Sequence, residues 1–126
     1  MSNPSREDIA LVLKHAYGLI EGGWCQGNSS KIISGNRRAY CAGGAISKAS
    51  MVVIGGFRGL SVEAAQQRYI EGRTLRHAAN WQLMTAIGGV SIPRWNDEPD
   101  RTKEDVLAAL ERAIEGVTNS EGVTNS

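Results

Sequence analysis

The helical spacing of apolar residues near both ends of the chain is the feature that most constrains its fold. One stripe follows Ser5 and stops at Gly22, and a second occupies residues 103–115. A hydroxyl residue that can cap a helix precedes each stripe, with an acidic residue three positions later. The sequence therefore predicts an amphipathic helix near each end. The apolar residues of the two stripes are Ile9, Val12, Leu13, Ala16 and Ile20, then Val106, Leu107, Leu110, Ala113 and Ile114.

Pairs of glycines divide the middle of the chain into shorter segments. The stretch "YCAGGAISKASMVVI", residues 40–54, predicts a buried helix whose small residues let a neighbouring helix approach. A strand at 51–57 is the alternative, because a short apolar run fits both structures. Residues 22–40 are rich in Gly, Asn and Ser and predict a loop with a short turn around Ile32 and Ile33.

Two further amphipathic helices are predicted at 61–72 and 74–87, and Thr74 is the expected cap of the second. We therefore expect a single all-α domain of about five helices over residues 1–116, with the first and last packed around the small-residue second helix. The chain ends in two copies of the six-residue unit "EGVTNS", and residues 117–126 lie within them. This tail has no apolar periodicity, and we expect it to be disordered.

The formal net charge of +1 hides an uneven distribution. Residues 31–76 carry eight basic and two acidic residues (+6), residues 77–126 four basic and eight acidic (−4), and residues 1–30 two basic and three acidic (−1). A mixed, solvated surface is the favoured interpretation, and an acidic partner of the middle segment is the alternative. For Trp81, core packing is favoured over base stacking. A nucleic-acid-binding surface would use Lys31, Arg37, Arg38, Arg68, Arg73 and Arg76.

Targeting signals are not evident in the sequence. No apolar run reaches the length of a transmembrane helix, and the N-terminal residues lack the basic-then-apolar pattern of a signal peptide. We therefore expect a cytoplasmic protein that does not associate with membranes.

The polar stretch "SIPRWNDEPDRTKEDV", residues 91–106, is mostly explained as the start of the last helix. Thr102 is placed to cap it, and Asp105 occupies its third position. Arg101 opposes the helix dipole, so it should have a carboxylate partner, and Asp97 is the nearest candidate. Trp95 is the expected apolar anchor of the stretch.

A second loop, "EGGWCQG", carries polar and aromatic residues between glycines. Whether loops 23–27 and 95–101 meet in one cleft is left open by the sequence. If they meet, they form the predicted binding site, whose candidate residues are Trp24, Gln26, Trp95, Asn96, Asp97 and Arg101.

The two cysteines, Cys25 and Cys41, are expected to be reduced thiols, as is usual in the cytoplasm. Cys41 follows two arginines and starts a predicted helix, which favours a thiolate, so Cys41 and then Cys25 are the candidates for a catalytic cysteine. A histidine base is required, and both histidines, His15 and His77, lie in predicted helices. The Cys and His residues form no short chelating pair, and no cofactor motif is present, so we expect neither metal nor cofactor.

Three elements in order, "GWCQG", "YCAGGAISKA" and "WNDEPDRTKEDVLAALERAI", resemble a family of short uncharacterised proteins of bacteria and phages, classed as a domain of unknown function. The resemblance implies a common helical fold and no assigned activity. The matching residues are Trp24 and Gly27, then Cys41, Ala42, Gly44, Ala45 and Ile46, then Trp95, Asn96, Asp97, Pro99, Arg101 and Thr102.

These observations favour a small non-enzymatic binding module that acts through protein contacts with an unknown partner, as an accessory or phage-linked factor. A nucleic-acid-associated factor and a cysteine-dependent enzyme are the alternatives. A homodimer is compatible with a domain of this size.

Overall fold

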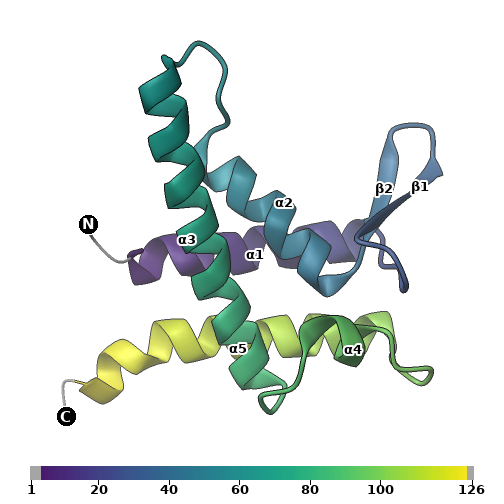
Figure 1. Ribbon diagram of the computed structural model, residues 1–126. Coiled ribbons are helices and arrows are strands. Elements are labelled where there is room, and N and C mark those ends of the chain that lie inside the picture. Colours follow the sequence, from purple (N-terminus) through teal and green to yellow (C-terminus); the bar gives the residue numbers. More distant parts are fainter. Residues whose placement is uncertain (1–3, 125–126) are drawn as a thin grey trace.

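The computed structural model describes residues 4–124, with side chains up to residue 119 (Figure 1). Its helices and strands in chain order are α1 (Arg6–Gly22), β1 (Ser30–Ser34), β2 (Arg37–Tyr40), α2 (Ala42–Ile54), α3 (Val62–Ala86), α4 (Ile92–Asn96) and α5 (Lys103–Thr124). The protein is mostly helical, as expected. It also contains a two-stranded antiparallel hairpin, so the prediction of a purely all-α fold was wrong.

The helices pack around α1. In Figure 1, α1 and α5 lie antiparallel to one another, and α3 crosses both of them. Helix α1 packs against α2, α3 and α5, whereas contacts between α2 and α5 are sparse. The central helix is therefore α1. We had expected the second helix, α2, to take this place. The largest fully buried apolar side chains are Leu13, Ile20, Ile46, Leu83, Leu110, Val12 and Val106.

The predicted helix caps at both ends of the chain are confirmed. The Ser5 hydroxyl accepts a hydrogen bond from the Asp8 N–H at 3.0 Å. At the start of α5, the Thr102 hydroxyl accepts from the Asp105 N–H at 3.1 Å, and the Asp105 carboxylate accepts from the Thr102 N–H at 3.0 Å. These bonds satisfy donors that the helix itself leaves unpaired.

The two helices predicted at 61–72 and 74–87 form one continuous helix, α3. Thr74 does not cap a helix, because its hydroxyl donates to the Ile70 carbonyl oxygen at 2.9 Å within the helix. Gly72 is buried, and a Cβ added there would lie 2.5 Å from Ile54 Cδ1. This glycine therefore serves the close approach of α2 and does not end the helix.

The segment predicted as a loop contains the hairpin, in which Ser30 pairs with Tyr40 and Ile32 with Arg38. Ile32 is 62% exposed and Ile33 is 45% exposed. Of the strand residues only Ala39 is buried, so the strands lack the apolar–polar alternation by which a strand is predicted. At the other uncertain segment, 51–57, α2 continues to Ile54, which excludes the strand there.

The repeated tail also differs from the expectation. Helix α5 continues to Thr124, and Val117 is 2% exposed in the core. The segment expected to be disordered is therefore helical over 117–124, and residues 125–126 lie outside the described part of the chain. No helix within the described residues is long and apolar enough to cross a membrane.

Candidate functional site

Asn96, the last residue of α4, joins the two loops that the sequence analysis singled out. Its side chain is completely buried. Its Oδ1 accepts hydrogen bonds from Trp24 Nε1 at 2.8 Å and from the Ala42 N–H at 3.0 Å. Its Nδ2 donates to the Cys25 carbonyl oxygen at 3.2 Å and to Asp97 Oδ1 at 2.9 Å. Loops 23–27 and 95–101 therefore meet, and a single amide fastens both of them to the start of α2.

Gln26 and Asp97 add further bonds to this Asn96 network. Gln26 Nε2 donates to the carbonyl oxygens of Asn96 and Glu98, at 3.0 and 2.8 Å. Asp97 Oδ1 accepts from the Gly27 N–H at 3.0 Å. The hydrogen bonds from the Asn96 side chain and then from the Gly27 backbone lower the pKa of Asp97 below its usual value. Most polar groups of these loops are thus bonded within the protein, and the two loops hold one another in place.

Arg101 packs on Trp95 and does not pair with Asp97, which was the predicted partner. Its guanidinium carbon lies 4.0 Å from the centre of the Trp95 ring, and its Nε donates to the Trp95 carbonyl oxygen at 2.8 Å. Its carboxylate contacts are with Glu98 at 4.0 Å and Asp105 at 3.9 Å. Trp95 is partly buried against the core, as expected of an anchor. The cation–π contact and the carbonyl bond orient Arg101 more than the long ion pairs do.

A pocket of about 920 Å³ lies beside the Asn96 network, and we call it the hairpin pocket. Residues from the loop after α1, the hairpin, α2, α3 and the α4 region all contribute to it. The first turn of α2 lines it, so the positive end of the helix dipole is directed towards this space, whereas the Ala42 and Gly44 N–H groups are bonded to Asn96 Oδ1 and to Cys41 Sγ. Its lining residues include the cationic or titratable Lys48, Arg76 and His77, the polar Ser47 and Asn80, and the apolar Met84, Ile92 and Pro93.

Several polar groups of the hairpin pocket have no partner within the protein. Asn80 Oδ1 is buried without a hydrogen-bond donor in the part of the chain that the structure describes. Over the same residues, neither Lys48 nor Arg76 has an ion-pair partner. Buried polar atoms are normally hydrogen-bonded, so the unpaired Asn80 acceptor is an exception that calls for an explanation.

The wall of the pocket depends on a close backbone contact at Gly44. A Cβ added to Gly44 would collide with the carbonyl oxygen of Ser29. That same oxygen accepts a hydrogen bond from the Cys41 N–H at 3.0 Å. A glycine is therefore required at the third position of α2 for loop 27–30 to lie against the helix.

The two cysteines differ in their surroundings. Cys41 is partly exposed to the hairpin pocket, and its Sγ caps α2 by accepting from the Gly44 N–H at 3.3 Å. Cys25 is buried, and its Sγ donates to the Asn28 carbonyl oxygen at 3.4 Å. Burial and then the nearby Cys41 raise the pKa of Cys25.

A catalytic cysteine needs a base that can take its proton. His77 lines the same pocket as Cys41, but no hydrogen bond joins the two side chains within residues 4–124. Over the described residues, no group of three or more His, Cys, Asp and Glu side chains is arranged to hold a metal ion.

The basic residues considered for nucleic-acid binding are divided between regions. Arg37 and Arg38 belong to the hairpin, where they donate to the Gly22 carbonyl oxygen and to Ser30 Oγ. Arg68 donates to the Gly56 carbonyl oxygen at 2.9 Å in the first half of α3, and Arg76 lines the hairpin pocket. Trp81 is 63% exposed, so its predicted core packing was wrong.

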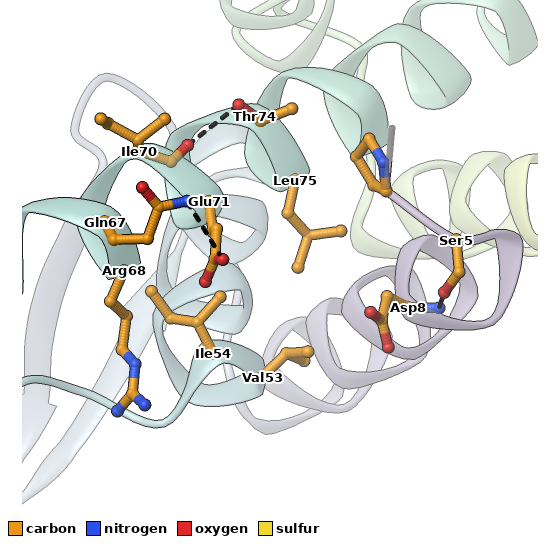
Figure 2. A pocket seen from close by; sticks show the side chains of 11 residues that line it. Ser5, Asp8, Val53, Ile54, Gln67, Arg68, Ile70, Glu71, Thr74 and Leu75 are labelled. Atoms are coloured by element: carbon orange, nitrogen blue, oxygen red, sulfur yellow. Dashed lines mark hydrogen bonds between the residues drawn. The ribbon is translucent and has the colours of Figure 1, made fainter. Parts of the chain in front are cut away.

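A second pocket, of about 610 Å³, lies between α1, the end of α2 and the first half of α3 (Figure 2). We call it the α1 pocket. Most of its polar side chains have partners within the protein: Thr74 bonds to the Ile70 carbonyl, Gln67 to Glu71, and Ser5 to the Asp8 N–H.

The comparison with known families gives one match that covers most of the chain. The model of a family of unknown function, DUF6197, matches residues 4–116. The chain belongs to this family. No curated protein and no solved structure matches this DUF6197 member.

Sequence reasoning missed most of the hairpin pocket. Of its cations, only Arg76 was singled out, and only for nucleic acid. Arg76, Asn80 and Met84 follow one another at four-residue spacing and therefore share a face of α3. That spacing was a usable signal, but the residues that complete the pocket come from distant parts of the chain.

Proposed function

We propose that this DUF6197 protein is a non-enzymatic binding module that takes an acidic segment of a protein partner into the hairpin pocket. The proposal is supported above all by the cations Lys48 and Arg76, which line the hairpin pocket and have no ion-pair partner among the described residues. Clusters of basic side chains commonly recognise acidic segments, and helix N-termini favour carboxylates.

The chemistry of the pocket suggests what such a segment contains. Lys48 and Arg76 supply charge-assisted donors for carboxylates, and Asn80 Oδ1 supplies an acceptor for a backbone or side-chain N–H group. Met84, Ile92 and Pro93 supply apolar surface. A short extended peptide that alternates acidic and apolar residues satisfies all three features.

The Asn96 network has an indirect part in this proposal. Asp97 and Gly27, which it joins, both line the hairpin pocket. Trp24 Nε1 donates a hydrogen bond to Asn96 Oδ1, and Gln26 Nε2 donates one to the Asn96 carbonyl oxygen. We therefore assign these three residues to shaping the pocket and not to contacting the partner.

Nucleic acid is the second candidate, because Trp81 is exposed on the face of α3 that also carries Arg73 and His77. A nucleic-acid surface is usually a continuous basic stripe. Here Arg37, Arg38 and Arg68 are held by internal hydrogen bonds in separate regions. This distribution favours the protein partner.

Two fluorescent probes of equal negative charge test the proposal. One is a peptide that alternates glutamate and leucine, and the other is a single-stranded oligonucleotide. Binding is measured by fluorescence anisotropy, and amide NMR shifts locate the contact. We expect the peptide to bind the more tightly and to shift the signals of Gly43, Gly44, Ser47 and Asn80.

The matched variants are K48Q combined with R76Q, and R73Q as the control. Arg73 lies exposed on the same helix but outside the pocket. We expect the double variant to weaken peptide binding by about tenfold or more and the control to change it by less than about twofold. Tighter oligonucleotide binding, or equal loss in both variants, would overturn the proposal in favour of nucleic acid or unspecific charge attraction.

The finer expectations about this family are part of the same proposal. We infer that the protein acts in the cytoplasm as an accessory or phage-linked factor, in line with the bacterial and phage proteins that its sequence elements resemble. Light scattering of the purified protein tests whether it forms a homodimer. A measured mass equal to that of one chain would exclude the homodimer.

A further inference from the structure

The two cysteines lie side by side where the chain after α1 meets the end of β2. The Tyr40 N–H donates to the Gly23 carbonyl oxygen at 2.9 Å, and the Cys25 N–H donates to the Tyr40 carbonyl oxygen at 3.1 Å. These two bonds form a parallel bridge between Trp24 and Tyr40. Cys25 directly follows Trp24 and Cys41 directly follows Tyr40, so the two cysteines are neighbours across this bridge.

Neighbouring positions on paired chains suit a disulfide. Paired backbones lie about 4.8 Å apart, and a disulfide joins Cα atoms that are roughly 4.4–6.8 Å apart. Side chains alternate along an extended chain, so the residues that follow the bridge point to a common side. Cys41 has extended backbone angles, with φ −78° and ψ 170°. The effect of Cys41 on the pKa of Cys25 is consistent with this proximity.

We propose that Cys25 and Cys41 form a thiol-oxidation site that closes to an intramolecular disulfide when the protein meets a peroxide. This site does not depend on the proposed peptide binding. Cys41 reacts first, because it is the cysteine exposed to the hairpin pocket, whereas Cys25 is 7% exposed. Cys25 is the resolving thiol.

The reaction is balanced with hydrogen peroxide as the oxidant. The Cys41 sulfur attacks one peroxide oxygen, the O–O bond breaks, and a sulfenic acid and one water are formed. The Cys25 sulfur then attacks the sulfenic sulfur, the S–O bond breaks, and the hydroxyl leaves as a second water with the Cys25 proton. Two thiols are oxidised and one peroxide is reduced.

Closure of the disulfide changes one wall of the hairpin pocket. The Cys25 thiol gives up the hydrogen that it donates to the Asn28 carbonyl oxygen. The sulfur of Cys41 is drawn towards Cys25 and away from the Gly44 N–H that it caps. Both Asn28 and Gly44 line the pocket, so oxidation acts on the site itself.

Peptide mapping of the oxidised full-length chain tests this inference. The purified protein is treated with hydrogen peroxide, remaining thiols are blocked with N-ethylmaleimide, and tryptic peptides are analysed without reduction. We expect the peptide carrying Cys25 to be joined to the peptide carrying Cys41 in monomeric protein, and to separate when a reducing agent is added. Two fully blocked thiols, or disulfides only between chains, would overturn the proposal.

Two matched variants establish the order of reaction. In C25S, we expect a dimedone-type probe to label a sulfenic acid at Cys41. In C41S, we expect at least about tenfold less label at Cys25, because burial limits access of the oxidant. Equal labelling of both variants would overturn the assigned roles, and the wild-type peptide map decides the disulfide even if a variant folds poorly.

Discussion

The two pockets beside α3 differ in how their polar groups are paired. In the α1 pocket, Thr74, Gln67 and Arg68 all bond to groups within the protein, and the Ser5 and Asp8 pair caps α1 (Figure 2). In the hairpin pocket, Lys48 and Arg76 have no ion-pair partner and Asn80 Oδ1 no donor among the described residues. Most polar groups of the α1 pocket are therefore satisfied within the protein, whereas the hairpin pocket leaves more of its groups available to a ligand.

The difference follows from where the partners lie along the chain. Most bonds in the α1 pocket join residues three or four positions apart, so α1 and α3 satisfy their own groups as they form. The hairpin pocket is built by the Asn96 network, whose bonds reach from α4 back to Trp24 and Gln26. Its shape is set only when distant segments meet, and this arrangement leaves side chains of α2 and α3 facing an unfilled space.

The largest expected effect is the loss of the Asn96 amide. N96A leaves the part-buried Trp24 Nε1–H and the buried Ala42 N–H without an acceptor. Each such group costs about 1–3 kcal/mol, so we expect unfolding free energy to fall by roughly 3–5 kcal/mol. Urea denaturation followed by circular dichroism measures this change.

N80A is the matched control on the hairpin pocket. Asn80 Oδ1 has no partner in the described part of the chain, so its removal should change the unfolding free energy by less than about 0.5 kcal/mol. A similar loss in both variants would mean that Asn80 is as much a structural residue as Asn96, and the contrast between the pockets would fail.

The next effect concerns the two adjacent glycines of α2. G44A forces the Ser29 carbonyl away from α2, and we expect a loss of about 1–3 kcal/mol. G43A places its methyl group 3.9 Å from Ile92 Cγ2, which is an ordinary contact, and alanine favours the helix more than glycine does, so we expect no loss and a gain of up to about 1 kcal/mol. Thermal unfolding of the two variants checks this order. Equal melting temperatures would show that loop 27–30 moves freely and does not form a fixed wall.

The sequence predicted the parts of this fold that depend on local chemistry. The caps at Ser5 and Thr102 were predicted correctly because a cap and its partner lie three residues apart. Gly72 was misread as a helix end, since its role depends on Ile54 of another helix. The role of Asn96 as the common partner of both loops could not be inferred for the same reason, because its bonds reach Trp24 and Ala42.

A smaller effect compares one arginine from each pocket. R68Q removes the hydrogen bond to the Gly56 carbonyl oxygen beside the α1 pocket, and we expect a loss of about 1 kcal/mol. R76Q removes a cation without an ion-pair partner in the described residues and should change stability by less than about 0.5 kcal/mol. Chemical denaturation measures both. A larger loss for R76Q would place Arg76 in a structural role and weaken its assignment to a ligand.

The smallest expected effect is a pH dependence confined to the hairpin pocket. Hydrogen bonds from Asn96 and Gly27 lower the pKa of Asp97 in the folded state. A lowered pKa contributes stability that is present above the unfolded pKa and is lost as the pH falls through the folded pKa. Because Asp97 is exposed, this contribution is small. We expect D97N to be less stable than the wild type near neutral pH, and the difference in stability to close in acid. D100N, which changes a nearby exposed carboxyl, should have the same stability as the wild type.

NMR signals of Gly27 and Asn28 should move with the Asp97 titration while those of Thr74 in the α1 pocket stay fixed. Movement at Thr74 with the same midpoint would show that the two pockets are coupled and not independent regions of α3.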